Sequence, residues 1–207
     1  MRFIDKILTI CFVLLCPLAH AQEETPSKFS LEAYGGLGYG IVVNEGAMDY
    51  NLNSNQGELL INYSLTQNLY IQTGVGYNQL SGSGMYAEGS FYHERDLLKI
   101  PLMLSYNFRT IDKFRLIGSL GGFGQTIIKD DYQFLNGTQS NGFQGWSFGL
   151  QVSASFVYQL NSNLGLGIKF NGQSDVTSHE PNQSQFFEGT QRLNNLSSLG
   201  LVFTCGF

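Results

Sequence analysis

The sequence predicts an all-β protein, an eight-stranded antiparallel up-and-down transmembrane β-barrel after an N-terminal signal peptide. Three observations favour this fold. Apolar and polar residues alternate with a period of two in eight separate segments, which is the side-chain period of a β-strand. Charged residues in these segments fall on one face only, and short and long connections follow one another in turn.

The first 21 residues have the pattern of a signal peptide. A positively charged start is followed by an apolar run of about a dozen residues, and Ala19 and Ala21 stand at the two positions that a signal peptidase reads. The run is too short to cross a bilayer as a helix. We therefore expect a signal peptide over residues 1–21, a short periplasmic lead over residues 22–28 and the barrel over residues 29–207.

The composition of the mature chain excludes several classes of protein. Removal of 21 residues from 207 leaves 186, enough for one domain, and only Cys205 of the three cysteines, so no intramolecular disulfide is expected. Loss of two of the 11 basic and one of the 16 acidic residues leaves a net charge of −6. Because no basic cluster is present, we expect no nucleic acid partner.

Each of the eight segments carries an apolar face and a polar face. The sixth is the clearest, since Trp146, Phe148 and Leu150 alternate with Ser147 and Gly149. The eight segments are residues 29–41, 58–65, 69–78, 98–108, 114–123, 146–158, 164–171 and 198–207.

Two positions depart from regular alternation. In the fifth segment, Gly121-Gly122 blurs the register before Phe123, which indicates a β-bulge. In the fourth, Pro101 lies in mid-strand, where it removes a hydrogen-bond donor from a sheet that has no free edge. We expect a local bulge or kink there as well.

The charged residues of the strands all fall on the polar face. They are Glu32, Glu58, Lys99, Arg115 and Lys169. A soluble barrel would place charges outside, whereas a lipid-facing Arg or Lys near the midplane costs about 2–4 kcal/mol. We therefore expect these side chains in the lumen, paired as a polar plug, because eight strands leave an interior that side chains fill. The alternative is a gate or permeation path.

The connections set the expected orientation. The short ones lie near residues 66–68, 109–113 and 161–163, and the long, polar ones span residues 44–56, 80–92, 129–142 and 174–193. Short periplasmic turns and longer extracellular loops are typical of outer-membrane barrels. The termini are therefore expected in the periplasm, with four loops outside the cell.

Outward aromatic residues gather near the strand ends. Tyr63 and Phe108 lie toward the expected periplasmic side, and Tyr77 and Trp146 lie toward the other side, as in interfacial girdles. The chain ends on Phe207 after alternating apolar residues, a pattern that resembles the signature read by the outer-membrane assembly machinery. The cell outer membrane, with its lipid and lipopolysaccharide, is the predicted location.

The fourth segment also carries a family resemblance. Residues 96–106, DLLKIPLMLSY, resemble the "YLEIPLLLKY"-type strand of the PorT-like, or porin-family, outer-membrane β-barrel proteins of Bacteroidetes. Residues 118–124 and 148–150 stand where that family has its glycine-rich and "FG" strands, but Lys99 replaces the family's Glu. The resemblance implies an eight-stranded barrel in the outer membrane, and the word "porin" there describes a fold.

No residue pattern indicates catalysis or a cofactor. His93 and His179 are expected as solvated loop residues, and two histidines in separate loops do not define a nucleophile, a base and an orienting group. Asp130-Asp131 is the only adjacent acidic pair of the expected barrel and has no metal-ligand spacing. We expect a non-enzymatic protein without cofactor or metal, and an apolar-facing structural thiol at Cys205.

The leading functional hypothesis is a structural or binding scaffold with a largely filled polar lumen. Its four extracellular loops would contact an envelope or extracellular protein or ligand. Three alternatives remain: a narrow pore for small solutes, an accessory component of a secretion or gliding system, which only the PorT-like resemblance suggests, and, more remotely, a rim enzyme that modifies lipids.

Overall fold

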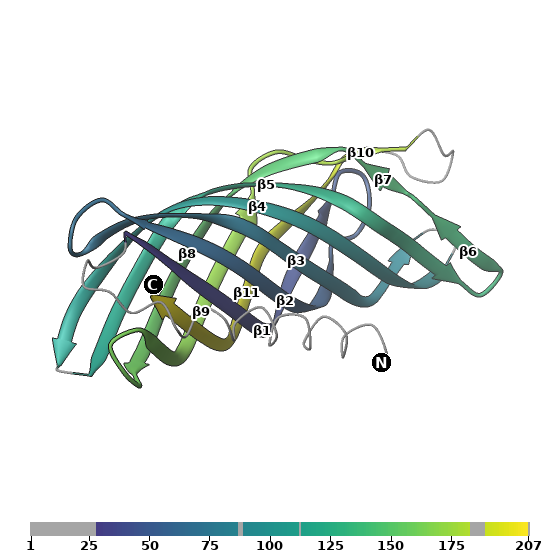
Figure 1. Ribbon diagram of the computed structural model, residues 1–207. Coiled ribbons are helices and arrows are strands. Elements are labelled where there is room, and N and C mark those ends of the chain that lie inside the picture. The colour runs from purple at the N-terminus through teal and green to yellow at the C-terminus, as the bar shows by residue number, and fades with distance from the viewer. Residues whose placement is uncertain (1–27, 87–88, 112, 183–188, 207) are drawn as a thin grey trace.

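Eight long antiparallel strands close into a barrel in the computed structural model, which describes residues 28–86, 89–111, 113–182 and 189–206 (Figure 1). Each strand pairs with the next along the ring, and the ring closes where the first strand pairs with the last. The barrel strands are β1 (Phe29–Asn44), β2 (Tyr50–Ser64), β3 (Leu69–Tyr86), β4 (Gly89–Ile111), β5 (Phe114–Phe134), β8 (Trp146–Gln159), β9 (Leu164–Asp175) and β11 (Gln191–Gly206). The predicted fold class is confirmed.

Three short strands lie at one end of the barrel. β6 (Gly137–Ser140) forms a hairpin with β5, and β7 (Phe143–Gln144) pairs with β10 (Glu180–Pro181) in a separate two-stranded sheet. The predicted signal peptide, most of the lead and Phe207 lie outside the described residues. Within the described ranges, no helix is long and apolar enough to cross a membrane.

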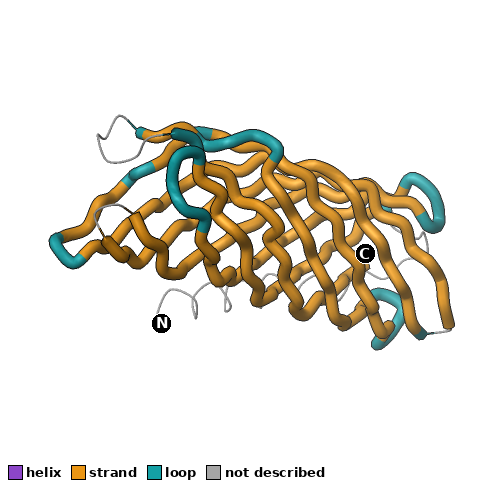
Figure 2. Tube along the Cα trace, turned by 180° about the vertical axis from the view of Figure 1, so that it is seen from behind, coloured by secondary structure: helices purple, strands orange, loops and turns teal. Residues whose placement is uncertain are grey.

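The two ends of the barrel differ. At one end, here called the turn end, short turns at residues 65–68 and 160–163 join neighbouring strands, and β1 begins beside the last residues of β11. At the other, the extended end, the strands project to different lengths and carry the short strands (Figures 1 and 2). β4 has 23 residues, about twice the 9–11 that a tilted strand needs to cross a bilayer.

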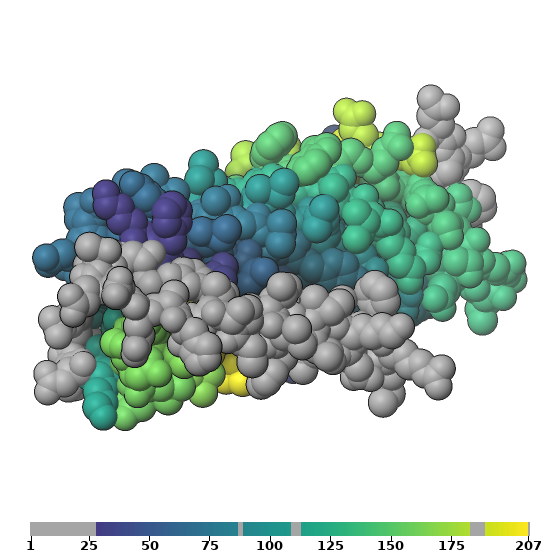
Figure 3. Space-filling model, viewed as in Figure 1, coloured from purple at the N-terminus to yellow at the C-terminus, as the bar shows by residue number. Residues whose placement is uncertain are grey.

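An apolar belt surrounds the half of the barrel next to the turn end. On β4 it runs from Leu98 to Phe108, and every outward side chain between them is apolar; Leu102 is 64% exposed. Aromatic residues border the belt, with Phe114 against Tyr158 at the turn end and Trp146 on the far side. On the face seen in Figure 3 the side chains of the teal and green strands form a closely packed wall. A closed barrel with such a belt satisfies its backbone hydrogen bonds within lipid.

Beyond the belt the inward and outward faces of β2 and β4 exchange polarity. β2 turns Asn51 and Asn53 outward and buries Tyr50 and Leu52, whereas Leu59 and its neighbours closer to the turn end face outward. On β4, the outward positions beyond Leu98 carry Tyr92, Glu94 and Asp96. These parts of the strands stand above the belt as a small barrel with an apolar interior.

The expectation of four long loops is therefore wrong. Residues 50–56 belong to β2, and residues 80–86 and 89–92 belong to β3 and β4. Residues 129–134 belong to β5, and the stretches between β5 and β8 and between β9 and β11 contain the short strands β6, β7 and β10. The sequence predicts loops for these segments because their outward residues are polar. In the structure, hydrogen-bonded pairing with neighbouring strands keeps them extended.

Neither predicted bulge occurs where the sequence placed it. Gly121 and Gly122 pair in unbroken register with Met103 and Leu102, and Phe123 turns into the lumen. The register shift lies further along β5, where Ile128 is the extra residue. Around Pro101, β3 and β4 pair in the same register before and after Ile100 and Pro101, the two residues of β4 that lack a partner on β3. The register is kept because proline lacks only the backbone donor. Alternation alone does not reveal which strand absorbs an additional residue.

Candidate functional site

Two buried lysines and two buried glutamates meet in the lumen at the level of the belt. Lys99 Nζ donates to Glu58 Oε1 at 2.5 Å, and its side chain is fully buried. Lys169 Nζ lies 2.8 Å from Glu32 Oε1 and 3.4 Å from Glu58 Oε2. The four charges cancel, and the pairing offsets the cost of burying each one.

Amide side chains extend this cluster across the lumen. Lys99 also donates to Gln151 Oε1 at 3.0 Å and to Gln173 Oε1 at 2.6 Å, so three acceptors surround one ammonium group. Gln151 Nε2 donates a hydrogen bond to Glu58 Oε1 and another, at 3.0 Å, to Asn171 Oδ1. We call this set of Glu32, Glu58, Lys99, Lys169 and the three amide residues the polar plug.

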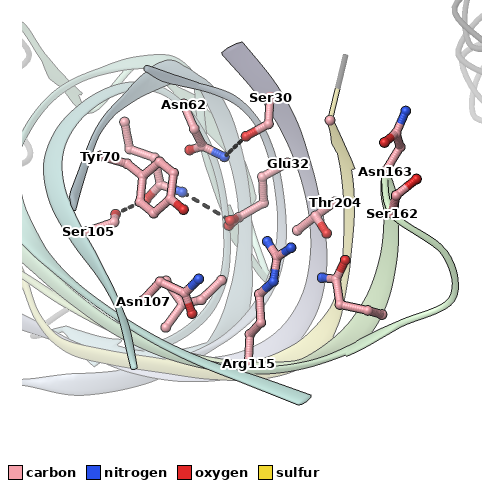
Figure 4. A pocket seen from close by; sticks show the side chains of 14 residues that line it. Ser30, Glu32, Asn62, Tyr70, Ser105, Asn107, Arg115, Ser162, Asn163 and Thr204 are labelled. Atoms are coloured by element: carbon pink, nitrogen blue, oxygen red, sulfur yellow. Dashed lines mark hydrogen bonds between the residues drawn. The ribbon is translucent and has the colours of Figure 1, made fainter. Parts of the chain in front are cut away.

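The structure brings together four of the five charged residues that the sequence singled out. Arg115, the fifth, is half-buried and lies closer to the turn end, where it lines a pocket that also contains Glu32 (Figure 4). Within the described residues it forms no ion pair or hydrogen bond. The sequence indicated that these residues share a face but not which of them are in contact.

Above the belt, a second core closes the barrel at the extended end. It is apolar and forms where the inward face changes from polar to apolar. Its buried members are Val42, Tyr50, Leu52, Leu80, Phe91, Leu97, Tyr132, Phe143, Leu193 and Leu196. Phe143 comes from β7, so the short strands contribute to the closure. We call this set the apolar core.

His93 lies inside this core, and its predicted place in a solvated loop is wrong. Its side chain is 0% exposed, with Nε2 2.7 Å from Asp130 Oδ1 and Nδ1 2.9 Å from the Tyr50 hydroxyl. Arg95 Nε donates to the same carboxylate oxygen at 2.7 Å, and the backbone N–H of Phe143 donates to the other at 2.9 Å. The ring also stacks on Tyr132.

Protonation states in this cluster follow from burial and charge. Burial is the main cause that lowers the pKa of His93 to about 4, although its hydrogen bond to Asp130 acts in the opposite direction. Burial opposes the charge of Asp130, but Arg95 and His93 outweigh it and lower the pKa of the carboxyl to about 2. At neutral pH, His93 is thus neutral, donates from Nε2 to the carboxylate and accepts from Tyr50.

His179 is likewise buried rather than solvated. Its backbone exchanges hydrogen bonds with Gln191 of β11, and burial lowers the pKa of its ring to about 4. For His93, the sequence signal that would have located it is the changed alternation of residues 89–97. There Phe91, His93 and Arg95 share the face opposite Tyr92 and Glu94.

The buried cluster has the composition of a structural site. Both ring nitrogens of His93 are occupied by Tyr50 and Asp130, and the side chain has no exposed surface from which to meet a substrate. In the described part of the chain, no group of three or more His, Cys, Asp or Glu residues could hold a metal ion. The arrangement ties β2, β4, β5 and β7 together.

No family model matches the sequence, and no curated protein is similar to it in sequence. Solved structures are similar in fold. OprG of Pseudomonas aeruginosa is 17% identical with a TM-score of 0.55 and covers 86% of this chain and 95% of its own. Neisserial surface protein A is 13% identical with a TM-score of 0.54, over 89% and 100%. The outer membrane protease OmpT of Escherichia coli is 12% identical with a TM-score of 0.52, over 91% and 99%.

These likenesses show the fold, which is that of the outer-membrane β-barrels. Together with the apolar belt and its aromatic borders, the fold defines an integral protein of the outer membrane.

Proposed function

We propose that this chain is a non-enzymatic barrel with a closed lumen that presents its extended end as a rigid binding surface outside the cell. The observation that carries the proposal is the presence of two successive closures. The polar plug fills the lumen within the belt, and the apolar core fills it above the belt. The short turns favour a periplasmic turn end, which puts the extended end outside.

The tips of the extended end supply the contact surface. Each of three connections exposes an apolar side chain at its tip: Leu135 between β5 and β6 is 100% exposed, Met48 between β1 and β2 is 70% exposed, and Met85 near the end of β3 is 56% exposed. Large apolar side chains held in solvent on a rigid support favour contact with a partner. They take the place of the long loops that the sequence had suggested.

Binding is tested by recovery of partners from native envelope and culture medium on the purified barrel. The change of Leu135 and Met85 to serine is expected to reduce recovery of a specific partner, because the apolar contact is lost. The matched control is Leu102→Ser in the lipid-facing belt, which leaves the tips intact. Equal recovery by wild type and tip variant contradicts the proposal.

A closed lumen is tested separately by planar-bilayer recording of refolded protein. Wild type is expected to show no stepwise conductance. The double variant Glu58→Ser with Lys99→Ser, which removes two large side chains from the polar plug, serves as the comparison for an opened lumen. Stepwise conductance of wild type at the level of a known small pore contradicts a closed lumen.

An enzymatic role is not proposed, because the His93 side chain is fully buried and both of its ring nitrogens are hydrogen-bonded. The fold is shared with OmpT, an outer membrane protease, but a fold does not transfer an activity. Lipid hydrolysis by wild type and His93→Ala provides the check. A wild-type rate above background that the variant loses would require a catalytic role for this histidine.

A narrow pore is the second candidate, and one observation favours it. Several buried polar atoms between the polar plug and the apolar core have no protein partner, including the amide of Asn78, Ser54 Oγ and Gln125 Oε1. Internal water is the usual partner for such atoms. A hydrated path would then need only a rearrangement of the core above it, which the bilayer recording would detect.

The PorT-like resemblance supports a further proposal, an accessory part in a secretion or gliding system. Assembly through Phe207 and contact of the belt with lipopolysaccharide belong to the same set of expectations. Affinity purification from envelope should then recover components of such a system. The absence of any reproducible partner removes this support.

A further inference from the structure

The extended end contains a strand with a free edge. β6 pairs with β5 alone and is the last strand in the order of the main sheet. It lies at the far tip of the extended end, where it continues the sheet formed by β4 and β5 (Figure 1). Each strand of the closed ring has a paired neighbour on both sides, so β6 differs from them in offering main-chain groups to a further strand.

Thr138 and Ser140 carry the main-chain groups of this edge. The ladder between β5 and β6 is antiparallel, and at its base the N–H of Asn141 donates to the carbonyl of Asp130 at 2.6 Å. Because hydrogen-bonded pairs alternate along such a ladder, Gln139 bonds to β5 while its two neighbours turn their N–H and C=O groups away from it. Both neighbours are exposed, and no strand of the described residues pairs with this side of β6.

The edge lacks most of the usual protection against pairing. Natural edge strands are kept apart by lysine, proline, a β-bulge, an inward charge or short length. The segment Gly137–Ser140, GTQS, contains no charged residue and no proline, and its register with β5 is unbroken, so only its length limits pairing. Donors and acceptors that alternate along an extended backbone are matched by a second extended backbone. The chemistry of the edge therefore indicates a polypeptide strand as its ligand.

The outer face of this sheet is acidic. Glu94, Asp131 and Ser140 lie in one row across β4, β5 and β6. Lys129 Nζ lies 2.7 Å from the carboxylate of Glu94 and 3.5 Å from that of Asp131, so one cation faces two anions. A strand added beside Ser140 continues this row, and lysine or arginine on its outer face is favoured by charge. Among the described residues, the other outward charges of the extended end have the same balance: they are Glu45, Asp49, Asp96, Glu180 and Arg192.

The inner side of the edge is apolar. Phe134 is paired with Gly137, and its ring packs against Phe91 of the apolar core with the centroids 5.5 Å apart. Gly137 has no side chain, and a Cβ added there would meet nothing within 4 Å. A β-branched side chain on the inner face of an added strand can therefore lie over Gly137 and contact Phe134.

We propose that the free edge of β6 takes up an extended segment of a partner protein as an additional antiparallel strand. Main-chain hydrogen bonds to Thr138 and Ser140 hold the segment. Its residues alternate between basic ones, on the side of Glu94 and Asp131, and β-branched ones, on the side of Phe134. This inference rests on the binding role proposed for the extended end and names the class of partner that the end accepts.

The test is fluorescence polarisation of labelled peptides with the refolded barrel in nonionic micelles. The probe is the hexapeptide amide KVKVKV. EVEVEV keeps the alternation and reverses the charge, whereas KPKPKP keeps the charge and replaces every valine by proline, which has no N–H. The probe is expected to bind at least about five-fold more tightly than either control, because only the probe supplies both the charge and the strand. Equal binding of the two lysine peptides, or no saturable binding of the probe, overturns the proposal.

Variants of the edge separate strand addition from surface charge. Ser140→Pro removes an outward N–H and leaves the donors of the ladder with β5 in place, since an edge strand tolerates proline. It is expected to weaken binding of the probe at least about ten-fold, as is Thr138→Pro, whereas Ser140→Ala, which keeps the main chain, should alter it less than about two-fold. Heat-modifiable gel migration confirms that each variant is folded. Equal binding by wild type and both folded proline variants overturns the proposal.

Two further outcomes contradict strand addition while the binding role stands. Partner recovery from native envelope may be lost in the Leu135 and Met85 serine variant and unchanged in folded Ser140→Pro; the tips then bind a partner without the edge. Sedimentation may reveal a dimer of wild type that Ser140→Pro dissociates; the edge then pairs with a second copy of this chain. The proposal predicts reduced partner recovery by Ser140→Pro and the same sedimentation for wild type and variant.

Discussion

Removal of the Glu58 carboxylate is the sharpest perturbation of the polar plug. In Glu58→Ala, Lys99 loses its partner at 2.5 Å and keeps only the amide oxygens of Gln151 and Gln173. Lys169 keeps Glu32 at 2.8 Å. Because the lysine stays fully buried with an uncompensated charge, the free energy of unfolding is expected to fall by about 3–5 kcal/mol.

The measurement is equilibrium unfolding in urea of the refolded barrel in micelles, followed by tryptophan fluorescence and by heat-modifiable gel migration. Trp146 is the single tryptophan and lies at the border of the belt, so its emission reports loss of the barrel. A shift of the urea midpoint with an unchanged slope would identify a change in stability rather than in compactness.

A matched double variant distinguishes the charge from the packing. Glu58→Met with Lys99→Met removes both charges and retains similar volumes, and it is expected to be neutral or more stable than wild type. If Glu58→Ala costs less than about 1 kcal/mol, the size of a pair exposed to solvent, the plug is hydrated and the reasoning fails. An equal loss in single and double variants would assign the effect to packing.

Three further predictions follow from other parts of the barrel. The pKa of His93 is lowered to about 4 in the folded barrel, so the unfolded state takes up the proton at a higher pH than the folded state does. The stability of the extended end is therefore expected to fall as the pH drops from about 6.5 to 4, by about 3 kcal/mol at most. Amide hydrogen exchange measures this loss, and a His93→Gln variant with the same pH dependence as wild type would be contrary evidence. Gly200→Ala is expected to lower the free energy of unfolding by about 1–3 kcal/mol, because the new Cβ overlaps backbone atoms of β1. The control Gly57→Ala, whose Cβ meets open space, should change the free energy of unfolding in urea by less than about 0.5 kcal/mol. Equal effects of the two variants would exclude steric overlap as the cause. Glu94→Gln breaks a half-exposed pair with Lys129 and should cost less than about 1 kcal/mol in the same assay, a larger loss indicating a buried role.

The sequence predicted the barrel because its determinants are local. Successive side chains of a strand point to opposite faces, so apolar residues at every second position of residues 98–108 mark a lipid face without knowledge of any partner. The absence of charge on that face identified the outside of the barrel. The same argument placed Glu58 and Lys99 inside, where the structure pairs them.

The height of the barrel above the membrane was not predictable in the same way. Residues 89–97 carry polar or charged residues on both faces, with His93 and Arg95 inward and Glu94 outward. Without knowledge of the pairing strands, such a polar stretch is interpreted as a loop. Only the ladders from β3 and β5 on either side show that this stretch is strand. His93 consequently moved from an expected solvated loop to a buried core.

By itself, then, the sequence determined the number of barrel strands, their membrane-facing sides and the charged residues that enter the lumen within the belt. The tertiary structure decided which lumen residues meet, since Glu32 and Lys169 are 137 positions apart and their contact depends on the stagger of strands around the closed ring. It also decided that Arg115 stays outside the plug and lines the pocket near the turn end. Alternation fixes a side, because the backbone pleat is local, while height along the barrel depends on register, which is a property of all eight strands together.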